Sequence, residues 1–114
     1  MTSASTDLVA AREAATRRVR DLRADLDDVI SSASSTTGDD EHDPEGATIG
    51  YERAQAQSLL DRAIARVAEL DDAIARAAAG TYGRCGVCRR VIGADRLAAR
   101  PGTDRCITCA TARR

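Results

Sequence analysis

The sequence predicts an all-α protein, in which a long antiparallel coiled-coil helical hairpin precedes a small four-cysteine module with a short terminal helix. Three observations predict this fold. Two apolar heptad patterns of similar length follow one another, a short acidic segment separates them, and two Cys-x-x-Cys pairs stand near the C-terminus. The predicted division is a hairpin over residues 1–79 and a cysteine module over residues 80–114.

The first predicted arm covers about residues 5–34. Its apolar residues recur at alternating steps of four and three, which is the spacing of a coiled-coil seam. Arg12 is the one polar residue in this series. The predicted seam positions are Leu8, Arg12, Ala15, Val19, Leu22, Leu26, Val29 and Ala33.

The second predicted arm covers residues 44–79 and shows the same alternation. Pro44 suits the first position of a helix, Asp43 before it suits the N-cap, and Gly80 suits the C-terminal stop. The predicted seam positions are Ile49, Arg53, Ala56, Leu60, Ala63, Val67, Leu70, Ile74 and Ala77.

The segment between the arms, residues 35–47, is rich in acids and contains no basic residue. Two apolar stripes joined by a short polar segment predict an antiparallel hairpin with this acidic tip at its turn. A solvated loop that only closes the hairpin is the alternative interpretation. Carboxylates held at the end of a thin arm would suit contact with a basic surface or with a bound Mg²⁺, which prefers oxygen ligands.

The cysteines predict a metal site. Two Cys-x-x-Cys pairs separated by seventeen residues can form a tetrahedral tetrathiolate cage, the preferred geometry of structural Zn²⁺. A closed set of four protein ligands leaves no position for water, so we expect one structural zinc in a Cys₄ zinc finger and no enzymatic activity. His42, the only histidine, is too remote in the sequence to be a ligand. The four ligands are Cys85, Cys88, Cys106 and Cys109.

Composition points to a cytoplasmic protein. No apolar run approaches the roughly 20 residues that span a membrane. The first residues lack the basic and apolar regions of a secretory signal, so we expect a reducing compartment, in which thiols bind metal more often than they form disulfides. A dithiol redox protein is the alternative, although the βαβ scaffold usual for that class is missing.

Arginine is concentrated in the predicted finger. Residues 80–114 contain eight arginines and two acids, while the whole chain has a net charge of −1. Arginine clusters can bind nucleic acid. The chain contains no Phe or Trp and two Tyr, however, so it has few rings on which bases could stack. We therefore expect no sequence-specific DNA binding and favour a solvated or protein-docking surface.

The finger and second arm carry a resemblance to a known family. The run Gly80-Thr81-Tyr82-Gly83-Arg84-Cys85-Gly86-Val87-Cys88, the run from Ile92-Gly93 to Arg100-Pro101, and Cys106-Ile107-x-Cys109 resemble the TraR/DksA family. The resemblance implies a bacterial regulator that binds RNA polymerase. It further implies that the coiled-coil tip is inserted through the secondary channel of the polymerase and modulates initiation.

The family's tip motif, Asp-x-x-Asp-x-Ala, is matched imperfectly. Counting back from Cys85 without gaps places it on His42, Glu45 and Ala47, whereas a shift of two residues selects Asp40 and Asp43. A gapless arm keeps the seam in register. These five residues are the predicted polymerase-contacting tip.

The resemblance also implies a basic surface near the finger that helps polymerase respond to guanosine tetraphosphate. The basic residues in that neighbourhood are Arg62, Arg96 and Arg100. Acids nearby, however, oppose an anionic ligand, so the sequence weighs against this cofactor. The acids are Glu69, Asp71 and Asp72.

A second functional hypothesis is a zinc-finger DNA-binding or adaptor protein that dimerises through its coiled coil. Salt-dependent affinity for DNA without polymerase would favour it. We expect a monomer instead, although the alanine-rich seam allows close helix approach with weak burial and leaves oligomerisation as an alternative.

Overall fold

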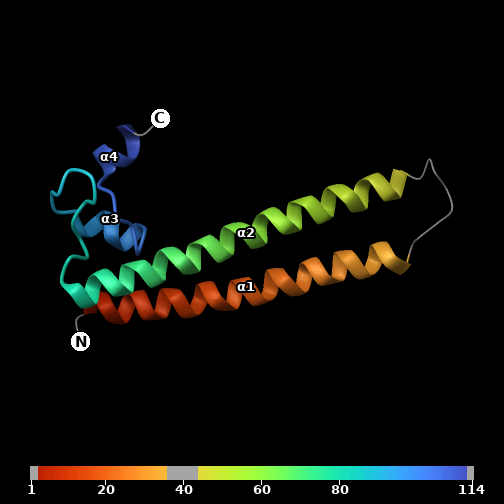
Figure 1. Cartoon of the computed structure of the whole chain (residues 1–114), viewed down its shortest axis with the longest axis horizontal. Helices are drawn as coiled ribbons and strands as arrows, with labels where there is room; N and C mark the ends of the chain where they lie inside the picture. Colours follow the sequence, from red (N-terminus) through yellow and green to blue (C-terminus); the bar gives the residue numbers. More distant parts are fainter. Residues whose placement is uncertain (1–2, 36–43, 113–114) are drawn as a thin grey trace. The chain divides into compact units, whose positions relative to one another are not determined.

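The fold is all-α, as predicted. The computed structural model describes residues 3–35 and 44–112, and these residues form four helices and no strand (Figure 1). They are α1 (Ser3–Ser35), α2 (Pro44–Ala79), α3 (Ala94–Ala99) and α4 (Ile107–Ala112). The two long helices pack together, and the two short helices belong to the finger.

Contacts group the chain into two compact units. One unit is residues 15–65, which includes α1 from Ala15 to its end and α2 from its start to Ala65. The other joins the start of α1, up to Ala14, to the end of α2 and the whole finger, from Arg66 onward. The predicted boundary between residues 79 and 80 stays a prediction.

The unit of residues 15–65 is held by the predicted seam. Leu22 and Leu26 of α1 are buried with Leu60 and Ala63 of α2. Burying an aliphatic side chain of this size contributes about 1.5–3 kcal/mol, so a few such residues can hold two helices together. The partly buried residues packed against this cluster are Val19, Ile30, Ala56 and Leu59.

Arg12, the polar residue in the first seam, has a partner within its own unit, the one that contains the finger. Its guanidinium forms an ion pair with Asp71 of α2. The hydrogen bond to Asp71 raises the pKa of Arg12 above its ordinary value. Arg12 therefore contributes a charged contact between α1 and α2.

α2 ends where glycine was predicted to stop it. Gly80 has a φ of 81°. Its amide donates to the carbonyl of Ala77, and the amide of Thr81 donates to the carbonyl of Arg76. This pair of bonds is the Schellman motif, which satisfies carbonyls that the last turn of a helix leaves free.

Two features of the finger-containing unit were not predicted. The first is α3. Gly93 is its N-cap residue and Asp95 lies in its first turn, and Pro101 shortly after its end is typical of a helix stop. The second is the complete burial of Ala73, which lies outside the predicted seam. A Cβ built on Gly102 would lie 3.6 Å from that of Ala73, so a finger turn covers a second face of α2.

Candidate metal centre and its surroundings

The four predicted ligands lie together. The sulfur atoms of Cys85, Cys88, Cys106 and Cys109 are all within 4.8 Å of one another. The Cys88 and Cys106 sulfurs are 3.7 Å apart. Zinc–sulfur bonds of about 2.3 Å place the corners of a tetrahedron about 3.8 Å apart, whereas a disulfide bond is about 2.05 Å. The spacing fits a metal cage.

Backbone turns place each pair of sulfurs. In the first turn, the amide of Arg89 donates to the carbonyl of Cys85, and the amide of Cys85 donates to the carbonyl of Arg90. The amides of Val87 and Cys88 point at the Cys85 sulfur, at 3.4 and 3.5 Å. Such N–H donors stabilise a thiolate, the form in which cysteine binds metal.

The second pair stands at the start of α4. Cys106 precedes the helix by one residue, and its sulfur accepts a hydrogen bond from the amide of Cys109 at 3.5 Å. The Cys106 carbonyl accepts from the amide of Ala110. The opening turn of α4 thus presents two sulfurs on the same side.

The electrostatics of the cluster favour a cation. Backbone hydrogen bonds from Cys88 and Cys106 lower the pKa of Cys85 to about 6. Hydrogen bonding to Cys106 raises the pKa of Cys109 to about 12. A divalent cation would balance the repulsion among four thiolates, and soft sulfur donors suit zinc.

A turn after α3 fastens the finger to α2. Pro101 and Gly102 occupy its centre, and the amide of Thr103 donates to the carbonyl of Arg100. Gly102 has a φ of 90°, which a type II turn requires at this position. Its amide donates to the Tyr82 hydroxyl oxygen at 3.0 Å, and its carbonyl accepts from Arg76 at 3.1 Å.

The three residues of the predicted basic surface belong to different units, and their common role stays a prediction. Arg62 belongs to the unit of residues 15–65, whereas Arg96 and Arg100 belong to the unit that contains the finger. Arg96 donates to the carbonyl of Arg105 at 2.7 Å and to the Thr103 hydroxyl at 3.5 Å. Arg96 therefore braces the finger's own backbone.

Glu69 neutralises two of the arginines in this region. Its carboxylate pairs with Arg66, one turn earlier on α2, and with Arg100 at 3.1 Å. Glu69, Arg96 and Arg100 line a groove of about 240 Å³. The carboxylate lies in the groove where an anionic ligand of the arginines would bind.

We expect Glu69→Gln to give this groove measurable affinity for anions. The amide keeps the shape of the side chain and frees the guanidinium groups of Arg66 and Arg100. Calorimetric titration with pyrophosphate and with guanosine tetraphosphate should show about tenfold tighter binding to the variant than to the wild type. The free energy of unfolding should change little, because ion pairs near the surface contribute at most about 1 kcal/mol.

Asp72→Asn is the matched control, because it removes one exposed charge from the same helix. Equal anion affinity in the wild type and Glu69→Gln would contradict the expectation. An equal gain in Asp72→Asn would attribute the effect to net charge alone.

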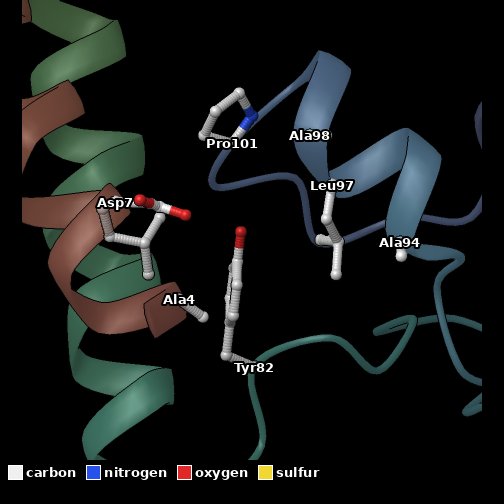
Figure 2. A pocket seen from close by; sticks show the side chains of 8 residues that line it. Ala4, Asp7, Tyr82, Ala94, Leu97, Ala98 and Pro101 are labelled. Carbon is white, nitrogen blue, oxygen red and sulfur yellow. The ribbon is translucent and has the colours of Figure 1, made fainter. Parts of the chain in front are cut away.

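A second groove, of about 500 Å³, is lined by Tyr82 (Figure 2). Figure 2 shows the Tyr82 ring between the start of α1, which contributes Ala4 and Asp7, and Leu97 of α3. No motif indicated this groove, because its walls come from three separate segments. The residues that line it are Ala4, Asp7, Leu8, Tyr82, Ala94, Leu97, Ala98 and Pro101.

Most of the predicted tip lies outside the described residues. Asp40, His42 and Asp43 precede α2 and are not described. Glu45 stands in the first turn of α2, and Ala47 in the same turn is exposed. The predicted role of these five residues stays a prediction.

No helix in the described part of the chain is long and apolar enough to cross a membrane.

Comparison with solved structures gives an informative likeness. No protein-family model matches the chain, and none of the curated proteins matches it. Among solved structures, the chain is similar to the transcription factor DksA2 from Pseudomonas aeruginosa, with a TM-score of 0.59 and 26% sequence identity. The match covers 94% of this chain and 82% of that one. A paired-helix fold and a four-cysteine cluster together fit a zinc-finger regulator of the TraR/DksA type.

Proposed function

We propose that this chain is a zinc-binding bacterial transcription regulator, which binds RNA polymerase and inserts its acidic tip into the secondary channel to modulate initiation. The likeness to DksA2 over 94% of the chain carries the proposal. The four-cysteine cluster supports it, because a helical hairpin alone occurs in proteins of many functions, whereas the hairpin together with this cluster is more specific.

The zinc has a structural role in this proposal. Bound by Cys85, Cys88, Cys106 and Cys109, it would stabilise a finger that buries few large apolar side chains of its own, Ile92 among them. Structural zinc contributes on the order of 10–16 kcal/mol in small modules. The turn at Gly102 then fixes the zinc-loaded finger to the end of α2.

The coiled coil delivers the tip in this proposal. Its seam is used within the chain, because Leu22, Leu26, Leu60 and Ala63 are buried against one another. The same residues are therefore unavailable as a dimerisation seam, which weakens the hypothesis of a DNA-binding or adaptor protein that dimerises through these helices.

Co-purification of the zinc-loaded protein with RNA polymerase, together with altered initiation at ribosomal RNA-type promoters, would support the proposal. Salt-dependent binding to DNA fragments in the absence of polymerase would favour the alternative. A zinc-loaded chain without measurable affinity for polymerase would rule the proposal out.

The tip makes a separate prediction. We expect the double variant Asp43→Asn/Glu45→Gln to bind polymerase but to lose most of its effect on initiation, because the carboxylates would act at the target while other surfaces provide affinity. The measurement is a multiple-round transcription assay beside a pull-down with polymerase.

The matched control is Asp27→Asn/Glu52→Gln, which removes the same charge from exposed positions on the two arms. If the tip and arm variants lose transcriptional effect equally, net charge and not the tip is responsible. Full activity of the tip variant would contradict the assigned role of the two carboxylates.

A further inference from the structure

The finger exposes aliphatic side chains on its surface. Val91 is 72% exposed, Val87 56% and Ile107 63%. Ile92, next to Val91, is 2% exposed. The finger therefore buries one aliphatic side chain here but leaves Val87, Val91 and Ile107 exposed to solvent. Exposed aliphatic side chains that gather in one place indicate an interaction site.

Two of these residues share a groove. Val91 and Ile107 line a groove of about 630 Å³ together with Arg90. Val87 lies in the adjacent turn, one residue before Cys88, which lines the same groove. The groove therefore runs between the first cysteine turn and α4, and Val87 adds a further exposed aliphatic side chain to that turn.

Arginine prevails in and beside this groove. Arg90 and Arg96 line it with one acid, Asp95, and with the predicted metal ligands Cys88, Cys106 and Cys109. Arg84 and Arg89 belong to the same stretch as Arg90, residues 80–94, which contains no acid. Arg84, Arg89 and Arg90 are exposed. These four arginines outnumber the one acid and the two negative charges that a zinc tetrathiolate would carry. Arg84 donates to the carbonyl of Arg89 at 3.3 Å, which holds the two residues together.

Arg89 occupies a backbone conformation that favours glycine. Its φ is 67°, because the turn that closes around Cys85 needs a left-handed residue there. Within the described ranges no hydrogen bond or ion pair is formed by its guanidinium group. The turn explains this φ, but it does not explain why arginine stands where glycine would be less strained, and the exposed guanidinium group points to a use outside the chain.

We propose that Val87, Arg89, Arg90, Val91 and Ile107 form a docking face for an acidic protein segment that carries aliphatic side chains. Arginine flanking an apolar centre is the composition of protein interfaces. Nucleic acid fits less well, since the face has no aromatic side chain for stacking. The docking face is distinct from the tip and does not depend on polymerase binding.

The test uses the zinc-loaded full chain and ¹⁵N NMR titration with three synthetic probes. They are a short peptide that alternates glutamate and leucine, the same peptide with glutamine for glutamate, and the same peptide with serine for leucine. Shift changes concentrated at residues 87–91 and at Ile107, produced by the first peptide and strongly reduced for the other two, are expected.

Variants separate binding from folding. Arg89→Gly removes the charge and relieves the left-handed strain, so it should weaken peptide binding about threefold while the unfolding temperature stays equal or rises. Val91→Ser should weaken binding by a similar factor. Arg23→Ala, which removes an exposed charge from α1, should change neither.

Three results would overturn the docking face. They are absence of localised shift changes with the glutamate–leucine peptide, unchanged affinity in Arg89→Gly, and equal or tighter binding of a single-stranded oligonucleotide to the same residues. The last result would identify the face as a nucleic-acid site.

Discussion

Replacing Cys85 with serine should abolish stoichiometric zinc binding and unfold the finger. Cys85 is 1% exposed, and its sulfur accepts two amide hydrogen bonds in the first turn. A serine hydroxyl is a poor substitute for a thiolate ligand, and the loss removes much of a metal contribution on the order of 10–16 kcal/mol. No other single substitution in the chain is expected to have a larger effect.

The measurements are zinc content by mass spectrometry and circular dichroism with limited proteolysis. We expect much of the helical signal to persist, because the unit of residues 15–65 has its own buried cluster, while protease cleaves the chain beyond Gly80. Acidification of the wild type should also release zinc, since protons compete for the thiolates.

Thr108→Ser is the control for Cys85→Ser, because it changes an exposed residue between two ligands without removing a sulfur. One zinc per chain in Cys85→Ser, with unchanged protease resistance, would contradict the assignment of Cys85 as a ligand.

Gly102→Ala should destabilise the attachment of the finger to α2. The new Cβ would lie 3.0 Å from Cδ2 of Leu70, which is fully buried. It would also stand at a φ of 90°, a conformation disfavoured for alanine. Left-handed strain of about 1–2 kcal/mol and overpacking of about 1–3 kcal/mol give an expected loss of about 2–5 kcal/mol.

Two other glycines separate these contributions. A Cβ on Gly80 meets no atom within 4 Å, but the φ of Gly80 is 81°. Gly80→Ala should therefore lower the stability only by the left-handed strain. A Cβ on Gly93 also meets nothing within 4 Å, and its φ is −62°, so Gly93→Ala should be nearly neutral. Urea unfolding of the zinc-loaded proteins measures all three. Equal losses for Gly102→Ala and Gly80→Ala would show that Leu70 accommodates the added methyl group.

Local patterns in the sequence were sufficient for much of the fold. The heptad positions Leu22, Leu26 and Leu60 are buried as predicted, because a helix with apolar residues every three or four positions has one face to cover. Gly80 ends α2 because the left-handed residue of a Schellman motif needs no Cβ. The cysteine spacing likewise identified four sulfurs that lie within 4.8 Å.

Contacts between residues that are far apart in the sequence could not be predicted in this way. Ala73 is buried by a turn nearly thirty residues later, and Glu69 pairs with Arg100 across a similar separation. Neither contact has a periodic signal in the sequence. The positive φ of Arg89 was also unexpected, since glycine is the residue that normally indicates such a turn.

The grouping of the first fourteen residues with the finger has a consequence for the order of biosynthesis. Arg12 pairs with Asp71, which is 59 residues later in the chain. Leu8 lines a groove that Tyr82 and Pro101 also line. Ribosomes release the N-terminus first, so the opening turns of α1 emerge long before their partners exist. The unit of residues 15–65 can pair earlier, from contacts that close shorter loops. The start of α1 is thus synthesised before the unit of residues 15–65 but acquires its contacts after that unit has formed, once the finger is made.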